Sequence, residues 1–165
     1  MQRRCTPAAD SRQEHGGAVA YQGLKPDAAR SFEGTGAGGT MQAPILLVED
    51  NRDCEELALR ALRKAGFNDV DVARDGAEAL SKLLDAPQAT NRCAPRFVLL
   101  DLKLPKIDGV DVLKRLRSDE RTSGLKVFAL SSSEDPREID SCLSLGVVAV
   151  LAKPLDTNTL KTLLV

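Results

Sequence analysis

The sequence predicts an α/β fold built on a doubly wound, five-stranded parallel sheet with helices on both faces. From Gln42 onward, short continuous apolar runs alternate with longer stretches whose apolar residues have helical spacing. Continuous apolar runs are typical of strands that are buried on both faces. Strands that are separated by helices must run parallel, and right-handed crossovers distribute those helices over both faces of the sheet.

Five strand–helix units account for the chain after residue 42. Strands are predicted at residues 45–48, 70–72, 97–100, 127–130 and 147–151. Helices are predicted at residues 53–65, 75–84, 110–117, 136–145 and 156–164. Gly66 should end the first helix, Asp75 should cap the second, and Pro136 suits the first turn of the fourth. We interpret Arg115 and Arg117 as part of a solvated face of the third helix.

Composition argues against several classes of function. The 165 residues suit one domain, and a hydrophobic content of 42% is enough for a single core. The formal net charge is -1, and this lack of basic excess argues against direct DNA binding as the main function. No apolar run is long enough to span a bilayer, and no secretory signal is present. We therefore expect a cytoplasmic protein that does not associate with membranes.

The cysteines are expected to be free thiols. They are Cys5, Cys54, Cys93 and Cys142, and the single histidine is His15. The wide spacing of these cysteines argues against a zinc site, and nothing in the sequence suggests export to a compartment where disulfides form.

Residues 1–42 are predicted to form a disordered leader, and residues 43–165 a single folded domain. Seven of the twelve glycines lie within the first 40 residues, where long apolar residues are sparse and show no periodicity. Such a segment cannot bury enough apolar surface to offset the entropy of ordering it. An alternative is that Met41 is the true start, because the first predicted strand begins shortly after it.

Polar residues follow four of the five predicted strands at the point where each strand ends. Glu49 and Asp50 follow the first strand, Asp101 the third, Ser131 the fourth and Lys153 the fifth. In doubly wound sheets, active sites collect at the carboxyl ends of the strands. We therefore expect three carboxylates, a hydroxyl and an ammonium group to converge at one edge of the sheet.

This combination of groups favours phosphoryl transfer to a carboxylate. Three clustered carboxylates repel one another and need a cation, and oxygen ligands without histidine or cysteine favour Mg²⁺. Lys153 would neutralise charge on the transferring group, and Ser131 would donate a hydrogen bond to a phosphoryl oxygen. Taken singly, Asp101 could be a turn or cap residue and Lys153 a solvated surface lysine. Ser132 is a rival to Ser131 for the role of hydroxyl donor.

Four motifs occur in order and at domain-wide spacing. They are Leu47–Asn51, Leu99–Gly109, Leu130–Ser131 and Lys153–Pro154. Together they resemble the receiver domain of response regulators, of the chemotaxis-regulator type, over about residues 43–165. The resemblance implies a flavodoxin-like sheet with the strand order 2-1-3-4-5. Residues 101–105 and 113–120 are also similar to the single-domain regulators that partner phytochrome-type histidine kinases.

The resemblance implies an acceptor and a metal site. Asp101 would be the phosphoacceptor, and its phosphoryl group would come from a phosphohistidine on a sensor histidine kinase or a histidine phosphotransfer protein. Asp50 would bind Mg²⁺ directly and Glu49 would bind it through water. Asp101 and the backbone carbonyl of Lys103 would complete the protein ligands of the metal.

The resemblance also implies how the acceptor is activated. Ser131 would turn towards the phosphoryl group, and Lys153 would pair with it. The peptide bond before Pro154 is usually cis in this family. Such a domain catalyses its own phosphorylation and dephosphorylation and does not turn over an external substrate.

Signalling is expected to occur through protein–protein contacts. In this family the changing surface lies on the last two helices and the last strand, here residues 134–165, and it would bind an unidentified downstream protein. The resemblance also allows a homodimer through the same face. Because the chain ends at Leu164 and Val165, no effector domain is expected to follow. Val150 stands where the family often has Tyr or Phe, which puts the usual aromatic switch in doubt.

Two other functions remain open from the sequence. The first is a phosphorylation-independent interaction module that retains the receiver fold, which Val150 and the short last helix motivate. The second is a phosphatase that resembles the haloacid dehalogenase family. Those enzymes require a second Asp two residues after the nucleophile, and Lys103 at that position argues against this function. The sequence Asp108–Gly109 is interpreted as a turn and helix start, not as a ligand.

Overall fold

The computed structural model describes residues 44–85, 94–133 and 135–164. The leader predicted at residues 1–42 and the alternative start Met41 lie outside the described residues. Three further residues also lie outside them: Cys5, His15 and Cys93. The other two cysteines, Cys54 and Cys142, are free thiols, as expected.

Strands and helices alternate along the described residues, as the sequence predicts. The strands are β1 (Ile45–Val48), β2 (Val70–Ala73), β3 (Val98–Asp101), β4 (Val127–Ser131) and β5 (Ala149–Ala152). The helices are α1 (Arg52–Lys64), α2 (Gly76–Leu84), α3 (Gly109–Ser118), α4 (Pro136–Ser144) and α5 (Thr157–Leu164). Within the described ranges, none of the helices combines the length and the apolar character that crossing a bilayer requires.

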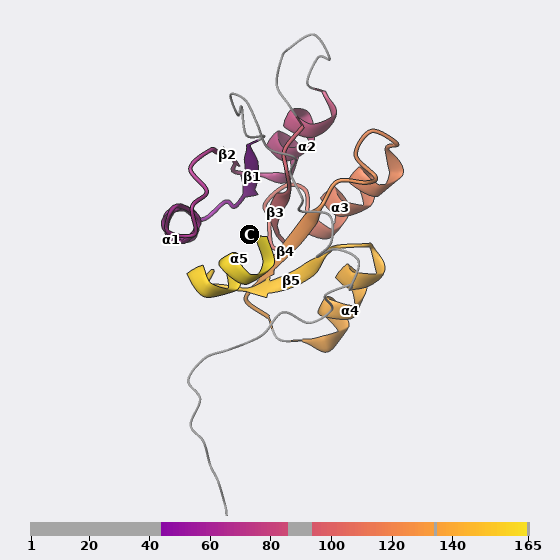
Figure 1. Ribbon diagram of the computed structural model, residues 1–165. Coiled ribbons are helices and arrows are strands. Elements are labelled where there is room, and N and C mark those ends of the chain that lie inside the picture. Colours follow the sequence, from indigo (N-terminus) through magenta and orange to yellow (C-terminus); the bar gives the residue numbers. More distant parts are fainter. Residues whose placement is uncertain (1–43, 86–93, 134, 165) are drawn as a thin grey trace, which may run out of the picture.

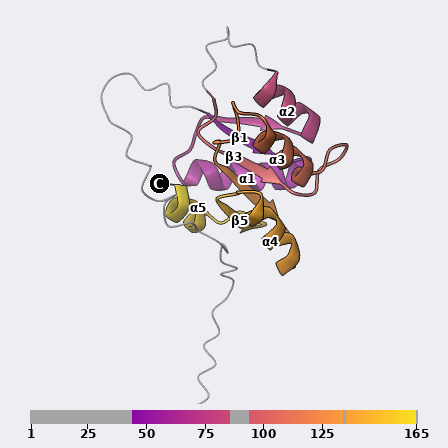
Figure 2. The ribbon, with the colours of Figure 1, turned by 90° about the vertical axis from the view of Figure 1, so that its right-hand side faces the viewer.

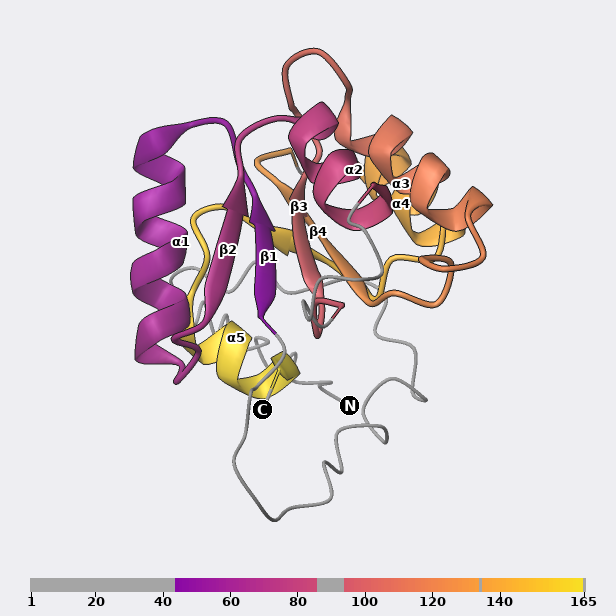
Figure 3. The ribbon, with the colours of Figure 1, turned by 90° about the horizontal axis from the view of Figure 1, so that it is seen from above.

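The five strands form one parallel sheet in the order β2-β1-β3-β4-β5. Seen from above, α1 and α5 cover one face of the sheet, and α2, α3 and α4 cover the other (Figure 3). Two further views show β5 between α4 and α5 at one end of the sheet (Figures 1 and 2). The predicted doubly wound, flavodoxin-like fold and its strand order are therefore confirmed.

Alternate residues of each central strand pack into two separate cores. Val48, Leu100 and Ala129 belong to the core beneath α2, α3 and α4. Their strand neighbours Leu47 and Leu99 belong to the core beneath α1 and α5. Because successive side chains of a strand point to opposite faces, a strand that is covered on both faces needs apolar residues throughout. This requirement explains the continuous apolar runs of the sequence.

The last three strands begin or end at other residues than the sequence pattern predicts. β3 and β4 each extend to a polar residue, because Asp101 pairs with Leu130 and Ser131 pairs with Ala152 in the parallel ladder. β5 begins two residues later than predicted, because the N–H of Val147 still bonds to a carbonyl in the last turn of α4. Asp101 and Ser131 are therefore held by the hydrogen bonds of the sheet.

Side-chain caps begin the first four helices. The caps are Asn51 for α1, Asp75 for α2, Asp108 for α3 and Asp135 for α4. Each side chain accepts a hydrogen bond from an N–H of the first turn, which satisfies donors that have no partner within the helix. The predicted cap Asp75 is confirmed, Pro136 begins α4, and Gly66 follows α1 with a left-handed φ of 98°. These caps fix the residues at which the four helices begin.

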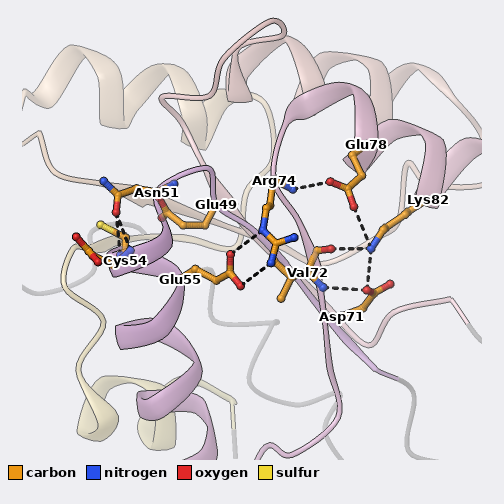
Figure 4. Close-up of polar contacts among 10 residues, drawn as sticks. Glu49, Asn51, Cys54, Glu55, Asp71, Val72, Arg74, Glu78 and Lys82 are labelled. Carbon is orange, nitrogen blue, oxygen red and sulfur yellow. Dashed lines mark hydrogen bonds and ion pairs between the residues drawn. The ribbon is translucent and has the colours of Figure 1, made fainter.

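Polar side chains cover the free edge of β2 (Figure 4). The N–H of Val72 donates to the carboxylate of Asp71, and Nζ of Lys82 donates to the Val72 carbonyl at 2.6 Å. Lys82 also lies 2.7 Å from Asp71. Arg74 directly follows β2, and its guanidinium donates two hydrogen bonds to Glu55 of α1, which joins the end of β2 to that helix. These contacts satisfy edge groups that would otherwise be open to pairing with another strand.

Arg117 is not part of a solvated helix face, so that prediction is wrong. Its guanidinium is partly buried and donates hydrogen bonds to four backbone carbonyls, at distances from 2.9 to 3.1 Å. The acceptors are the carbonyl groups of Ser123, Leu125, Leu145 and Gly146. Burial lowers the pKa of Arg117. The side chain therefore ties the C-terminal end of α4 to the segment that enters β4, whereas Arg115 is exposed, as predicted.

We expect Arg117→Ala to lower the free energy of unfolding by about 1 to 3 kcal/mol, because four carbonyl groups, three of them in partly buried hydrogen bonds, lose a charged donor. Arg115→Ala, on the exposed side of the same helix, should change it by less than about 0.5 kcal/mol. Urea denaturation of both variants measures the difference. Equal stability of the two variants would contradict this role for Arg117.

Candidate functional site

The ammonium group of Lys153 lies between two buried carboxylates at the carboxyl edge of the sheet. Its Nζ is 2.6 Å from Oε2 of Glu49 and 2.7 Å from Oδ2 of Asp101. The side chains of Glu49 and Asp101 are 2% and 6% exposed, and that of Lys153 is 16% exposed. Because buried carboxylates this close together repel each other, the shared cation is what stabilises both charges.

Backbone contacts set the positions of these three residues. Glu49 directly follows β1, and its N–H donates to the carbonyl of Ala73 in β2. Asp101 is the last residue of β3, and Ser131 is the last residue of β4. Lys153 directly follows β5, and its N–H donates to the carbonyl of Ser131 at 3.0 Å. Parallel strands end at the same edge of a sheet, and this brings residues far apart in the sequence to one place.

Burial and the neighbouring charges shift the pKa values of two groups of the site. Burial raises the pKa of the Glu49 carboxyl, the negative charge of Asp101 adds to the rise, and the hydrogen bond from Lys153 opposes it. For Lys153, burial lowers the pKa, but hydrogen bonds to Asp101 and Glu49 outweigh it, so the pKa is raised. Lys153 therefore keeps its positive charge at neutral pH.

Three carboxylates come together in a cluster that fits a hard cation. One oxygen atom each of Glu49, Asp50 and Asp101 lie within 4.8 Å of one another. Glu49 and Asp101 are buried, whereas Asp50 is exposed, so the cluster opens to solvent at Asp50. The N–H of Lys103 donates to Oδ1 of Asp101 at 3.0 Å, which places Lys103 beside the cluster. Carboxylate oxygens without histidine or thiolate are the donors that Mg²⁺ prefers.

Among the three consecutive serines, Ser131 is the one that lies inside the protein. Ser131 is buried, Ser132 is exposed and Ser133 is half-buried. Since the backbone carbonyl of Ser131 bonds to Lys153, the serine and the lysine are neighbours at the site. The peptide bond between Lys153 and Pro154 is cis, as the resemblance implies.

The loop after Asp101 passes very close to the start of α3. A Cβ atom at Gly109 would lie 2.2 Å from the carbonyl oxygen of Asp101 and 2.7 Å from Cα of Leu102. The N–H of Gly109 donates to the carbonyl of Leu102 at 3.0 Å. Only glycine allows this approach, and Asp108 caps the helix. The interpretation of Asp108–Gly109 as a turn and helix start is therefore confirmed.

A second contact holds the same loop against α2. Lys106 has a left-handed φ of 66°, and its Nζ lies 2.5 Å from the carboxylate of Asp75. A Cβ atom at Gly76 would lie 2.4 Å from the carbonyl oxygen of Ile107. The sequence pattern did not indicate these contacts. A glycine directly after a predicted helix cap is the signal that could have suggested the close approach.

Val150 lies in the core at the position where the family often has an aromatic residue. It is 6% exposed and pairs with Ala129 across β4 and β5. Its side chain packs in the apolar cluster that also holds Cys142 of α4. Val150 has no polar atom in its side chain, so it can follow a movement of its neighbours only through packing.

We expect Gly109→Ala to lower the free energy of unfolding by about 1 to 3 kcal/mol, because the new methyl group would displace the backbone of Asp101 and Leu102. Gly124→Ala is the matched control, since a Cβ atom there meets nothing within 4 Å. Denaturant unfolding of both variants tests this prediction. A Gly109→Ala variant as stable as the control would contradict the close packing of the loop.

The comparisons with known proteins agree on one family. A family model described as the response regulator receiver domain matches residues 45–165. The probable methanogenesis regulatory protein FilR2 of Methanothrix harundinacea is 39% identical over 118 residues, which are 71% of this chain and 76% of that protein.

Solved structures show the same fold. The bacteriophytochrome response regulator AtBRR is 42% identical with a TM-score of 0.65, over 73% of this chain and 89% of that chain. The Mn²⁺-bound form of response regulator Rcp1 is 28% identical with a TM-score of 0.62, over 73% of this chain and 88% of that chain. The family model spans most of the chain, and the strands of the sheet have the order that the resemblance implied. The chain therefore belongs to the receiver-domain family of two-component response regulators.

Proposed function

We propose that the chain is a phosphorylation-driven receiver in which Asp101 accepts a phosphoryl group from a phosphohistidine. The observation that carries this proposal is the buried carboxylate of Asp101, which is held at both oxygen atoms. Oδ1 accepts the N–H of Lys103, and Oδ2 accepts the ammonium of Lys153. A carboxylate that is fixed in this way is oriented for reaction before the donor arrives.

In the transfer, an oxygen atom of Asp101 forms a bond to phosphorus as the bond between phosphorus and the histidine nitrogen breaks. The electron pair of the broken bond stays on the imidazole, which takes up a proton from water. Lys153 keeps its ammonium beside the acceptor and neutralises charge on the phosphoryl oxygens. The hydroxyl of Ser131 donates a hydrogen bond to one of those oxygens. Attack by water on the phosphorus later returns the free carboxylate and phosphate.

Glu49, Asp50 and Asp101 would hold a Mg²⁺ ion, with the backbone carbonyl of Lys103 as a further ligand. Asp50, the exposed member of the cluster, would contact the metal directly, and the buried Glu49 would contact it through water. The ion would supply positive charge that offsets the repulsion between the anionic donor and the anionic acceptor. The all-oxygen cluster supports this assignment, as does the Mn²⁺-bound form of the relative Rcp1.

The donor would be a sensor histidine kinase or a histidine phosphotransfer protein in the cytoplasm. Receiver domains take phosphoryl groups from such proteins, and the likeness to the bacteriophytochrome response regulator AtBRR favours a kinase of the phytochrome type. The output would be a contact with a downstream protein through α4, β5 and α5, and the same face would serve a homodimer. Direct DNA binding is not part of this proposal.

Incubation with acetyl phosphate and Mg²⁺ should phosphorylate the wild-type protein and leave Asp101→Asn unlabelled, because the amide cannot act as the nucleophile. Asp111→Asn is the matched control, since Asp111 is an exposed carboxylate on α3 that pairs with Lys114. Intact-mass spectrometry reports the added phosphoryl group. Equal labelling of wild type and Asp101→Asn would overturn the assignment of the acceptor.

The alternative is a phosphorylation-independent interaction module, which the buried Val150 in place of an aromatic residue favours. This alternative predicts no Mg²⁺ affinity and the same affinity for a partner in Asp101→Asn as in wild type. A Mg²⁺ titration that follows amide chemical shifts by NMR separates the two functions.

If the metal site is functional, Asp50→Asn should weaken Mg²⁺ binding by at least about ten-fold, because a direct anionic ligand is lost. Asp53→Asn is the matched control, since Asp53 is an exposed carboxylate in the first turn of α1. The same NMR titration measures both variants. A wild-type protein whose spectrum does not respond to Mg²⁺ would favour the interaction module.

A further inference from the structure

The loop that carries Asp50 is short and is held at both ends. It comprises Glu49, Asp50 and Asn51, between the end of β1 and the start of α1. The N–H of Glu49 donates to the carbonyl of Ala73 at 3.0 Å, and Asn51 caps α1. The N–H of Asn51 also donates to Oε1 of Glu49 at 3.3 Å. Because Asp50 lies between these two residues, its position depends on how α1 sits relative to the end of β2.

Arg74 makes a side-chain contact between those two elements (Figure 4). It directly follows β2, and its guanidinium donates two hydrogen bonds to the carboxylate of Glu55 in the first turn of α1, at 3.1 and 3.2 Å. The N–H of Arg74 donates to Glu78 of α2 at 2.8 Å, which fixes the backbone from which the guanidinium extends. A paired fork of this kind sets both the distance and the direction between its partners.

These contacts close a ring that includes Asp50. From Arg74 the ring runs through Glu55 to Asn51, because the N–H of Glu55 donates to the carbonyl of Asn51 at 2.8 Å. From Asn51 it returns through Asp50 and Glu49 to the last residue of β2, which directly precedes Arg74. If the first turn of α1 moved away from β2, the pair of Arg74 and Glu55 would break and Asp50 would move with the helix.

A second ion pair on α1 lacks these properties and provides a comparison. Arg60 and Glu56 lie four residues apart on the same helix, and both side chains are 63% exposed. The Glu55 side chain is 13% exposed, and its partner Arg74 lies outside the helix. Exposed pairs within one helix contribute little to stability, whereas a bidentate arginine–carboxylate pair is the kind that contributes measurably. The pair of Arg74 and Glu55 can therefore hold two elements together, and the pair of Arg60 and Glu56 cannot.

We propose that Arg74 is a positioning residue for the metal ligand Asp50. Its paired hydrogen bonds to Glu55 hold the first turn of α1 against the end of β2, and this keeps the carboxylate of Asp50 beside those of Glu49 and Asp101. Arg74 acts through Asp50 and has no contact with the ion. This inference rests on the proposed Mg²⁺ site and adds a residue outside the carboxylate cluster on which the affinity of that site depends.

The decisive variant is Arg74→Gln, because positioning and charge predict opposite results for it. Loss of a positive charge near the carboxylate cluster would by itself tighten Mg²⁺ binding. Loss of the position of Asp50 weakens it, and we expect the dissociation constant to rise about three-fold, the effect of one well-formed ion pair. Arg60→Gln is the matched control, since it removes the same charge from a pair on α1 and should leave the dissociation constant unchanged. A Mg²⁺ titration that follows amide chemical shifts by NMR measures both variants, and urea denaturation verifies that both are folded.

Reversing the pair separates its geometry from its charges. Arg74→Glu alone should also weaken Mg²⁺ binding. Adding Glu55→Arg to it restores an ion pair and should recover the affinity, although the added positive charge by itself would weaken binding further.

The proposal is overturned if Arg74→Gln binds Mg²⁺ as tightly as wild type or more tightly. It is also overturned if the reversed pair binds no more tightly than Arg74→Glu alone. If the wild-type protein does not respond to Mg²⁺, the proposed metal site itself fails and the role of Arg74 fails with it.

Discussion

The site depends on one ammonium group, that of Lys153, which bonds to two carboxylates that are buried side by side. Removing Glu49 and Asp101 from water is costly unless opposite charge and hydrogen bonds compensate. Lys153 supplies the charge, and the N–H groups of Asn51 and Lys103 supply bonds to the two carboxylates. With Asp50 included, three carboxylates face one ammonium, which leaves two negative charges when all are ionised. A divalent cation matches that excess, and the exposed Asp50 marks the side from which it would enter.

The backbone holds this cluster before any partner binds. Asp101 and Ser131 are paired in the ladder of the sheet, so neither belongs to a free loop. The turn after Asp101 is fixed by the close approach of Gly109 and by the ion pair of Lys106 with Asp75. If Asp101 accepts a phosphoryl group as proposed, a carboxylate that is already positioned would need little reorganisation, because positioning and charge stabilisation are most of what a protein contributes to phosphoryl transfer.

Helix α4 is attached at both ends, and the two attachments differ in kind. At its C-terminal end, Arg117 holds the carbonyls of Leu145 and Gly146 with a charged, partly buried group. At its N-terminal end, the connection is made by neutral hydrogen bonds through Ser133 to the cap Asp135. Neutral hydrogen bonds contribute less than charged ones, so the N-terminal end is the easier one to shift. That end is also the one that is connected to the buried Ser131 at the site.

The sequence by itself determined the fold, the cap Asp75 and the set of polar residues at the strand ends. Apolar periodicity and caps such as Asp75 are local, and parallel strands necessarily bring Glu49, Asp101 and Lys153 to one edge. Only the tertiary structure decided that Arg117 is partly buried and bonds to four carbonyl groups, and that Gly109 lies against the backbone of Asp101. A local sequence pattern cannot distinguish an arginine or a serine that faces water from one that bonds to a carbonyl group. The partners of these residues come from other segments, and their hydrogen bonds exist only once those segments have packed together.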